Sequence, residues 1–146
     1  MNPRAGFTLV ETLVALVLVA AAGALAAGFL RAPPAAVAVD AELRRLADVL
    51  NRARADAVAS QRESRVVIDA TTRSYGVEGA ASRRLPDEVA MSADLIAGGA
   101  RQVGAVRFFP AGTASGGTIR LATRGAEGAV HVNWATGAVS IERATR

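Results

Sequence analysis

The longest apolar run of the chain lies within its first thirty residues. After a short polar leader that ends at Gly6, residues 7–30 contain a single charged side chain, Glu11. About 20 apolar residues in a helix are enough to cross a hydrocarbon core of roughly 30 Å. The pattern therefore predicts a membrane-spanning helix over residues 7–30, preceded by a separate leader over residues 1–6.

A cleaved secretory signal also combines a basic leader with an apolar core. Such a core is usually only about 7–15 residues long and ends at a small-residue cleavage site. The run in this chain is longer, and its most distinctive residues lie at its start. We therefore expect any cleavage to precede the apolar run and the helix to remain on the protein.

A second helical pattern follows an interruption at Pro33 and Pro34. Proline lacks an amide proton and disfavours helical angles in the residue before it, so we expect a hinge over residues 31–38. From about residue 39 to 61, apolar residues recur three and four apart, as on one face of a helix. These residues are Leu43, Leu46, Leu50, Ala53 and Ala57.

This stripe predicts the core-facing side of a helix, since five apolar positions cover too few heptads for a coiled coil. Asp40 is expected to cap the amino end of the helix. The charged residues of this segment lie largely off the stripe: Glu42, Arg45, Asp48, Arg52 and Asp56.

Beyond residue 64 the apolar residues alternate with polar or small ones, as in half-buried strands. The alternating sets are Val66 and Ile68, Tyr75 and Val77, Val106 and Phe108, Ile119 and Leu121, Val130, Val132 and Trp134, and Val139 and Ile141. Residues 110–117 predict a loop, and Thr136 with Gly137 predicts a hairpin turn. Residues 82–104 show no clear period.

Two aromatic residues differ in their expected positions. Trp134 continues the alternation of Val132, so we expect its side chain in the core. Phe109 follows the inward Phe108 and points the other way, which makes it the better candidate for an interface contact.

The composition of the chain narrows the possible functions. The 146 residues include 17 basic residues, all Arg, and 13 acidic ones, and the formal charge of +4 is too small to imply nucleic acid. The absence of Cys excludes disulfides and thiolate metal sites. The single histidine, His131, is expected on the solvent face of a strand. We therefore predict no catalytic residues, no metal site, no cofactor and no enzymatic activity.

Gly6 followed by the sequence FTLVE resembles the processing signal of type IV pilins and type II secretion pseudopilins. The resemblance implies that a prepilin peptidase cleaves after Gly6 and that the new amino terminus on Phe7 is methylated. It also implies that the Glu11 carboxylate neutralises the positive amino terminus of a neighbouring subunit in a filament core. Such pairing would remove much of the cost of burying either charge.

Residues 108–121, FFPAGTASGGTIRL, and residues 132–141, VNWATGAVSI, resemble the type II secretion protein H (GspH) family. The resemblance implies an α+β, pilin-like fold, in which a long N-terminal helix spans the membrane with its first half. The second half of that helix would pack on an antiparallel β-sheet domain.

The same resemblance implies a minor pseudopilin in the bacterial inner membrane, with a single membrane span and residues 39–146 in the periplasm. Its partners would be other minor pseudopilins, the major pseudopilin and the inner-membrane secretion platform. It would act near the tip of the pseudopilus that drives folded proteins across the outer membrane.

A minor pilin of a type IV pilus is the alternative, either priming pilus assembly or binding DNA for uptake. DNA binding would need a cluster of exposed arginines, and the candidates are Arg120, Arg124, Arg143 and Arg146. Residues 137–140, however, lack the closely spaced arginines that DNA-binding relatives carry in this region. Nucleic acid is therefore not the expected partner.

Overall fold

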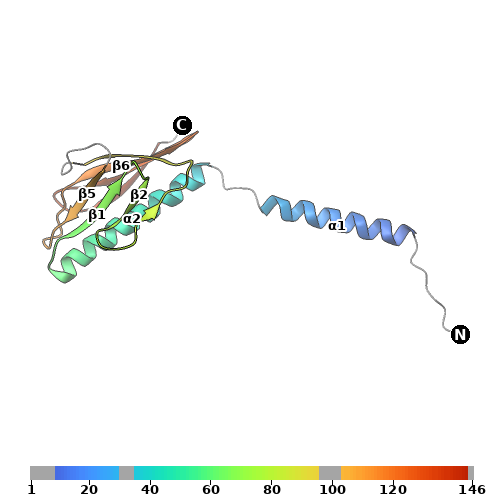
Figure 1. The fold of residues 1–146 in the computed structure, drawn as a ribbon, viewed down its shortest axis with the longest axis horizontal. Helices are drawn as coiled ribbons and strands as arrows, with labels where there is room; N and C mark the ends of the chain where they lie inside the picture. Colours follow the sequence, from blue (N-terminus) through green and yellow to red (C-terminus); the bar gives the residue numbers. More distant parts are fainter. Residues whose placement is uncertain (1–8, 30–34, 96–102, 145–146) are drawn as a thin grey trace. The chain divides into compact units, whose positions relative to one another are not determined.

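The computed structural model describes residues 9–29, 35–95 and 103–144. The chain forms two compact units, Met1–Pro33 and Pro34–Arg146. Helix α1 (Leu9–Phe29) is the described part of the first unit (Figure 1). The second unit contains helix α2 (Ala35–Ser60) and the eight strands found among the described residues.

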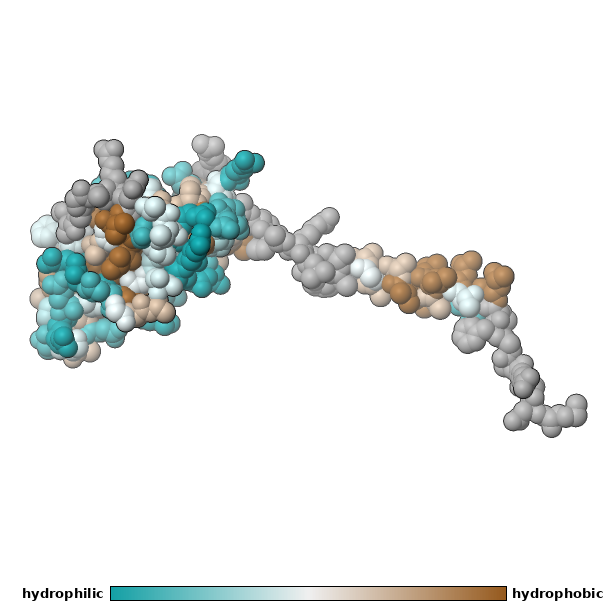
Figure 2. Space-filling view, in the orientation of Figure 1, coloured by the Kyte–Doolittle hydropathy of each residue, from teal (hydrophilic) through white to brown (hydrophobic). Residues whose placement is uncertain are grey.

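Helix α1 consists almost entirely of Leu, Val, Ala and Gly, and Figure 2 shows apolar residues along its surface. Its large side chains are exposed, among them Leu9 at 82% and Val19 at 70%. A helix that is apolar on every side is normally buried, either in a protein core or in a membrane. Over the described residues, neither helix is long and apolar enough to count as a candidate membrane span. The span predicted for residues 7–30 extends beyond the described residues at both ends and stays a prediction.

Helix α2 begins at Ala35, four residues earlier than the apolar period predicted. Residues 35–38 of the predicted hinge are therefore helical, and residues 31–34 lie outside the described residues. Asp40 lies inside the helix, so its predicted role as the N-cap is wrong. The physical reason is that alanine is the best helix former, so the alanines at positions 35, 36 and 38 extend the helix beyond Asp40.

Two four-stranded antiparallel sheets follow helix α2 in the sequence. The first sheet has the order β3 (Arg83–Arg84), β2 (Ser74–Val77), β1 (Ser64–Asp69) and β5 (Val103–Phe108). The second sheet has the order β4 (Ala90–Asp94), β6 (Gly117–Thr123), β7 (Ala126–Val132) and β8 (Val139–Ala144). The predicted α+β class with antiparallel strands is confirmed. The segment without a clear period contains β3 and β4, and residues 96–102 of it lie outside the described residues.

Strand register places the predicted inward residues on common faces. Val66 lies opposite Val106 in the first sheet, and Ile119 lies opposite Val130 in the second. All four side chains are fully buried. The predicted loop over residues 110–117 separates β5 from β6, and the predicted turn at Thr136 and Gly137 lies in the β7–β8 hairpin.

The core forms where helix α2 packs on both sheets (Figure 1). All five residues of its predicted apolar stripe are fully buried, so the stripe is confirmed as the core face. The helix approaches the second sheet closely at Gly128 of β7. A Cβ atom there would lie 2.4 Å from Cδ1 of Leu43 and 3.0 Å from the carbonyl oxygen of Glu142. A glycine is therefore required for this close contact between helix and sheet.

We expect Leu50→Ala to lower the free energy of unfolding by about 2–5 kcal/mol, because it leaves a cavity where helix α2 meets the sheets. Leu50 is fully buried, whereas Val37 on the same helix is 55% exposed. Val37→Ala is therefore the matched control and should change stability by less than about 0.5 kcal/mol. Urea denaturation of the detergent-solubilised chain, followed by circular dichroism, measures both. Equal effects of the two substitutions would contradict the assignment of the core.

Candidate functional site

The N-terminal candidate residues fall on either side of the boundary of the described residues. Gly6 and Phe7 lie outside them, so cleavage after Gly6 and methylation of Phe7 stay predictions. Glu11 lies in the first turn of helix α1. A carboxylate in this position interacts favourably with the positive end of the helix dipole. Its pairing with the amino terminus of a neighbouring subunit stays a prediction.

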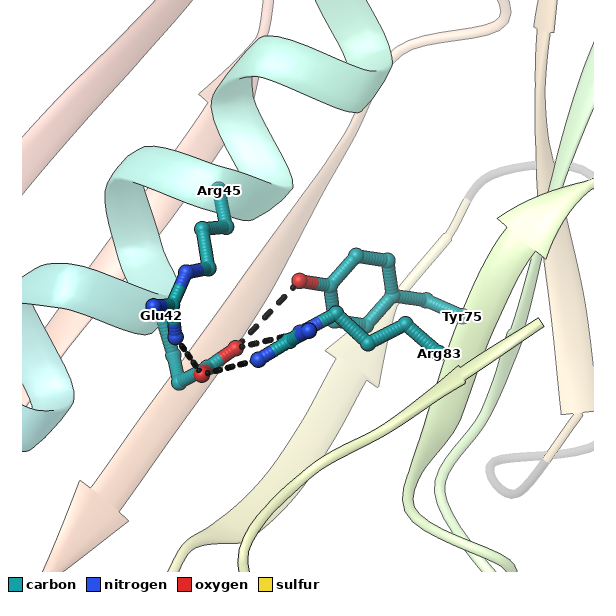
Figure 3. Close-up of polar contacts among 4 residues, drawn as sticks. All are labelled: Glu42, Arg45, Tyr75 and Arg83. Atoms are coloured by element: carbon teal, nitrogen blue, oxygen red, sulfur yellow. Dashed lines mark hydrogen bonds and ion pairs between the residues drawn. The ribbon is translucent and has the colours of Figure 1, made fainter.

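Glu42 forms the most extensive buried polar contact of the second unit (Figure 3). The guanidinium of Arg83 donates two hydrogen bonds to its carboxylate, from Nη2 to Oε1 at 2.9 Å and from Nε to Oε2 at 3.2 Å. Arg45, one turn along the helix, donates to Oε1. The hydroxyl of Tyr75 on β2 donates to Oε2 at 3.4 Å. The cluster thus connects helix α2 to strands β2 and β3.

Glu42 lies off the apolar stripe as predicted, yet only 2% of this residue is exposed. Glu42 lies three residues after the buried Val39 and four before Leu46, which places it on the flank of the stripe. That spacing was the feature of the sequence that could have indicated the burial of Glu42. Arg83 and its strand fall in the segment without a clear period, so the sequence did not show what covers this flank.

The pKa values of this cluster follow from burial and charge. Burial by itself would raise the pKa of Glu42, but the hydrogen bonds from Arg83 and Arg45 outweigh it and hold the pKa below its ordinary value. Burial, followed by the nearby Glu42 charge, raises the pKa of Tyr75 to about 12. At neutral pH the carboxylate is ionised and the phenol is neutral. The cluster is therefore a buried ion pair with a neutral phenol beside it, and it links helix α2 to the first sheet.

A second site lies at the carboxyl end of helix α2, where residues 109–116 and 133–138 meet; we call these two segments the loop pair. The Arg54 side chain of helix α2 donates from Nε to the carbonyl oxygen of Gly112 at 3.2 Å. The amide of Ala114 donates to the carbonyl oxygen of Trp134 at 2.9 Å. A Cβ atom on Gly137, which has a φ of 63°, would lie 2.2 Å from the Gly112 oxygen. The loops therefore contact each other through their backbones.

The prediction that Trp134 lies in the core is wrong, because 68% of it is exposed. Strand β7 ends at Val132, and the backbone turns at Asn133. The Asn133 side-chain oxygen accepts hydrogen bonds from the amides of Ala135 and Thr136 at 2.9 and 3.1 Å. Side chains alternate between faces only within a strand, so the rule no longer applies at position 134.

Phe109 is half-buried, in contrast to the fully buried Phe108 beside it. The guanidinium carbon of Arg107 lies 5.6 Å from the centre of its ring, within the range of a cation–π contact. The predicted opposite orientation of the two phenylalanines is consistent with this difference in burial. A role of Phe109 in an interface stays a prediction.

Two family models match this chain. The model described as "Type II transport protein GspH" matches residues 42–137, which include nearly all of the loop pair. The model of the prokaryotic N-terminal methylation motif matches residues 1–27. The chain belongs to the GspH family. The resemblance found in the sequence is thereby confirmed.

Relatives of this GspH-family chain agree with that assignment. The "Type II secretion system protein H" of Xanthomonas campestris pv. campestris is 32% identical over 140 residues, which cover 92% of this chain and 80% of the relative. Two solved structures of the minor pseudopilin EpsH, from the type II secretion system of Vibrio cholerae, match with TM-scores of 0.59 and 0.61. They cover 72% and 76% of this chain, and 96% and 97% of EpsH. At 14% identity, this likeness shows a common fold.

Among the residues that the structure describes, the arginines that a DNA-binding relative would need do not form a cluster. Arg143 forms an ion pair with Asp40 of helix α2, with 2.6 Å between Nε and Oδ1. Arg120 lies opposite Ala129, which in turn lies opposite Glu142, so Arg120 and Arg143 project from opposite faces of the second sheet. Arg124 lies in the β6–β7 turn, and Arg146 lies outside the described residues. This arrangement does not favour the DNA-uptake alternative.

His131 lies on the outer face of the second sheet, as predicted. Its Nδ1 is 2.9 Å from the hydroxyl of Thr118, and its Nε2 is 2.8 Å from Oε2 of Glu142. Within the described ranges, no group of three or more His, Asp or Glu side chains could hold a metal ion. His131 thus makes cross-strand hydrogen bonds on this face.

We expect Glu42→Gln to lower the free energy of unfolding at pH 7 by about 1–2 kcal/mol, since the two half-exposed arginines can be rehydrated. The folded-state pKa of Glu42 is lowered, so its contribution is present above the ordinary carboxyl pKa and is lost as the pH falls through the folded value. The difference between the variant and the wild type should therefore shrink on acidification. Urea denaturation at a series of pH values measures this change.

Glu88→Gln, at an exposed carboxylate, is the matched control for Glu42→Gln. It should leave stability unchanged within about 0.5 kcal/mol at every pH. If Glu42→Gln were as stable as Glu88→Gln at pH 7, the stabilising role of the cluster would be wrong.

Proposed function

We propose that this GspH-family chain is a minor pseudopilin of a type II secretion system. The single observation that carries the proposal is that one chain combines the methylation motif over residues 1–27 with the GspH match over residues 42–137. The first feature is a signal for processing and assembly, and the second is the folded domain of a secretion subunit. The protein would act as a structural subunit near the tip of the periplasmic pseudopilus.

In this proposal each unit of the chain has its own role. After removal of residues 1–6, the segment 7–30 anchors the protein in the inner membrane and later packs in the filament core. The exposed apolar side chains of helix α1 support this role, because packing between helices or lipids would remove them from water. The second unit lies in the periplasm and contacts other subunits there. The proposed partners are the prepilin peptidase, the other pseudopilins and the inner-membrane secretion platform.

The proposed function is structural and needs no catalytic group. Among the described residues, the best-defined polar cluster, that of Glu42, has the pKa directions of a stabilising contact. The loop pair has the character of a contact surface, because it exposes a tryptophan on a fixed backbone. Both features fit a subunit that works by assembling with its neighbours.

We expect Gly6→Val to prevent removal of the leader, because a branched side chain next to the cleaved bond would obstruct the peptidase. Mass spectrometry of the protein purified from its native host would detect residues 1–6 and no methylated Phe7. Gly23→Val is the matched control, since a Cβ atom at Gly23 meets nothing within 4 Å and lies far from the cleaved bond. Normal processing of Gly6→Val would exclude the proposed maturation.

We expect Glu11→Ala to leave membrane insertion intact and to reduce the recovery of co-purified pseudopilins by about tenfold or more. The reason is that the amino terminus of a neighbouring subunit would lose its counter-charge in an apolar filament core. Membrane fractionation and quantitative mass spectrometry measure the two effects.

Thr12→Ala is the control for Glu11→Ala, because it changes the adjacent residue of helix α1 and removes only a local hydrogen bond to the carbonyl oxygen of Leu9. It should assemble normally. Recovery of partners with Glu11→Ala at the wild-type level would show that the charge-pairing role is wrong.

A further inference from the structure

Trp134 is a large apolar side chain that the folded domain leaves exposed. It is 68% exposed, the largest value among the large hydrophobic residues of the second unit that the structure describes. Single exposed apolar side chains are common, so exposure alone indicates little. The rigidity and the chemistry of its surroundings distinguish Trp134.

The backbone that carries Trp134 is fixed from several directions. The Asn133 amide donates to the carbonyl oxygen of Ala138 at 2.9 Å, and the Gly137 amide donates to the carbonyl oxygen of Asn133 at 2.8 Å. The carbonyl oxygen of Trp134 itself accepts the amide of Ala114 in the neighbouring loop. The backbone of Trp134 is thus fixed before any partner arrives, which lowers the entropic cost of binding.

The loop pair itself carries no charged side chain, and Arg54 and Arg107 border it, the first at Gly112 and the second over the ring of Phe109. Neither segment of the loop pair contains an Asp, Glu, Lys, Arg or His residue, although 21% of the chain is charged. Val58 of helix α2 is 43% exposed and lies beside the loop pair, with its Cγ2 3.8 Å from a Cβ atom built on Gly112. Depletion of charge around an aromatic residue is typical of the core of a protein interface.

The position of the loop pair separates it from the membrane-anchoring end of the chain. Helix α2 has 26 residues and so extends roughly 39 Å at 1.5 Å per residue. The chain enters the domain at Ala35, and the loop pair lies at the opposite end of the helix, beside Arg54 and Val58. The loop pair is therefore distinct from the end of helix α2 that continues into the N-terminal segment.

We propose that the loop pair with Val58 is a docking surface for the globular domain of a different pseudopilin, with Trp134 as its anchor. The inference rests on the proposed function, since it needs a filament in which subunits meet. Arg54 and Arg107 border this surface, so a basic partner would be repelled and the partner presents an apolar pocket without basic residues. Neighbours along a filament meet head to tail, so the surface contacts a different surface.

The test uses the full chain in its native host, with a photo-crosslinking amino acid placed at position 134. We expect an adduct with another pseudopilin of the same secretion system, identified by mass spectrometry. The matched control carries the crosslinker at Val37, which is 55% exposed at the other end of helix α2. It should not give the same adduct. Adducts only with lipid, only with a second copy of this chain, or with no protein would overturn the proposal.

Substitutions at position 134 measure how much the Trp134 side chain contributes to binding of the other pseudopilin. Trp134→Ala should reduce the recovery of that pseudopilin by about tenfold or more, as is usual for a central aromatic contact. Trp134→Arg should reduce it further, and Trp134→Phe should restore much of it. Thermal unfolding of Trp134→Ala should match the wild type, which separates lost binding from lost folding.

The same variants separate this inference from the proposed function. If the wild-type chain is processed and recovers pseudopilins, and Trp134→Ala recovers them equally well, only the proposed docking surface is wrong. Wild-type chain that is not processed and recovers no pseudopilin would overturn the proposed function as well.

Discussion

The packing of one face of helix α2 against two sheets is the contact on which the second unit depends. Each four-stranded sheet has an apolar face that another element must cover. The stripe from Leu43 to Ala57 supplies that cover for both sheets at once. The close approach at Gly128 allows Leu43 to contact the backbone of the second sheet directly. A substitution in this stripe should therefore affect both sheets together.

Polar contacts along the same helix set where the rest of the domain lies. Asp40, near its start, forms an ion pair with Arg143 of β8, and Glu42 binds Arg83 and Tyr75 of the first sheet. Arg54, near its end, donates to Gly112 in the loop pair. These contacts fix the helix to three separate parts of the domain. The loop pair is thus positioned by the same element that forms the core.

The two units of the chain differ in what covers their apolar residues. Helix α2 buries its apolar stripe within its own domain, whereas helix α1 exposes Leu and Val side chains on its surface. The second unit thus has a buried core of its own, whereas the large apolar side chains of helix α1 are exposed in the isolated chain. That difference agrees with the proposed role of the N-terminal segment of a pseudopilin, which lies first in a membrane and then in a filament.

The sequence by itself determined the elements whose residues repeat with a regular period. The stripe of helix α2, the paired strands such as β1 and β5, and the loop over residues 110–117 all follow from spacing and turn chemistry, which are local properties. The family followed from short motifs, since Gly6 with FTLVE and the segment around Trp134 are specific sequences. The start of helix α2 could not be placed in this way, because the prolines before it are compatible with either a hinge or a first helical turn.

Only the tertiary structure decided the positions that depend on contacts between distant segments. Glu42 is buried because Arg83, 41 residues later, covers its flank of the helix, and no local pattern reports such a partner. Trp134 is exposed because β7 ends two residues earlier and Asn133 turns the backbone, which ends the alternation that predicted a core position. Local spacing thus identified the faces of the elements, and long-range contacts decided which of their edges are covered and which remain open to a partner.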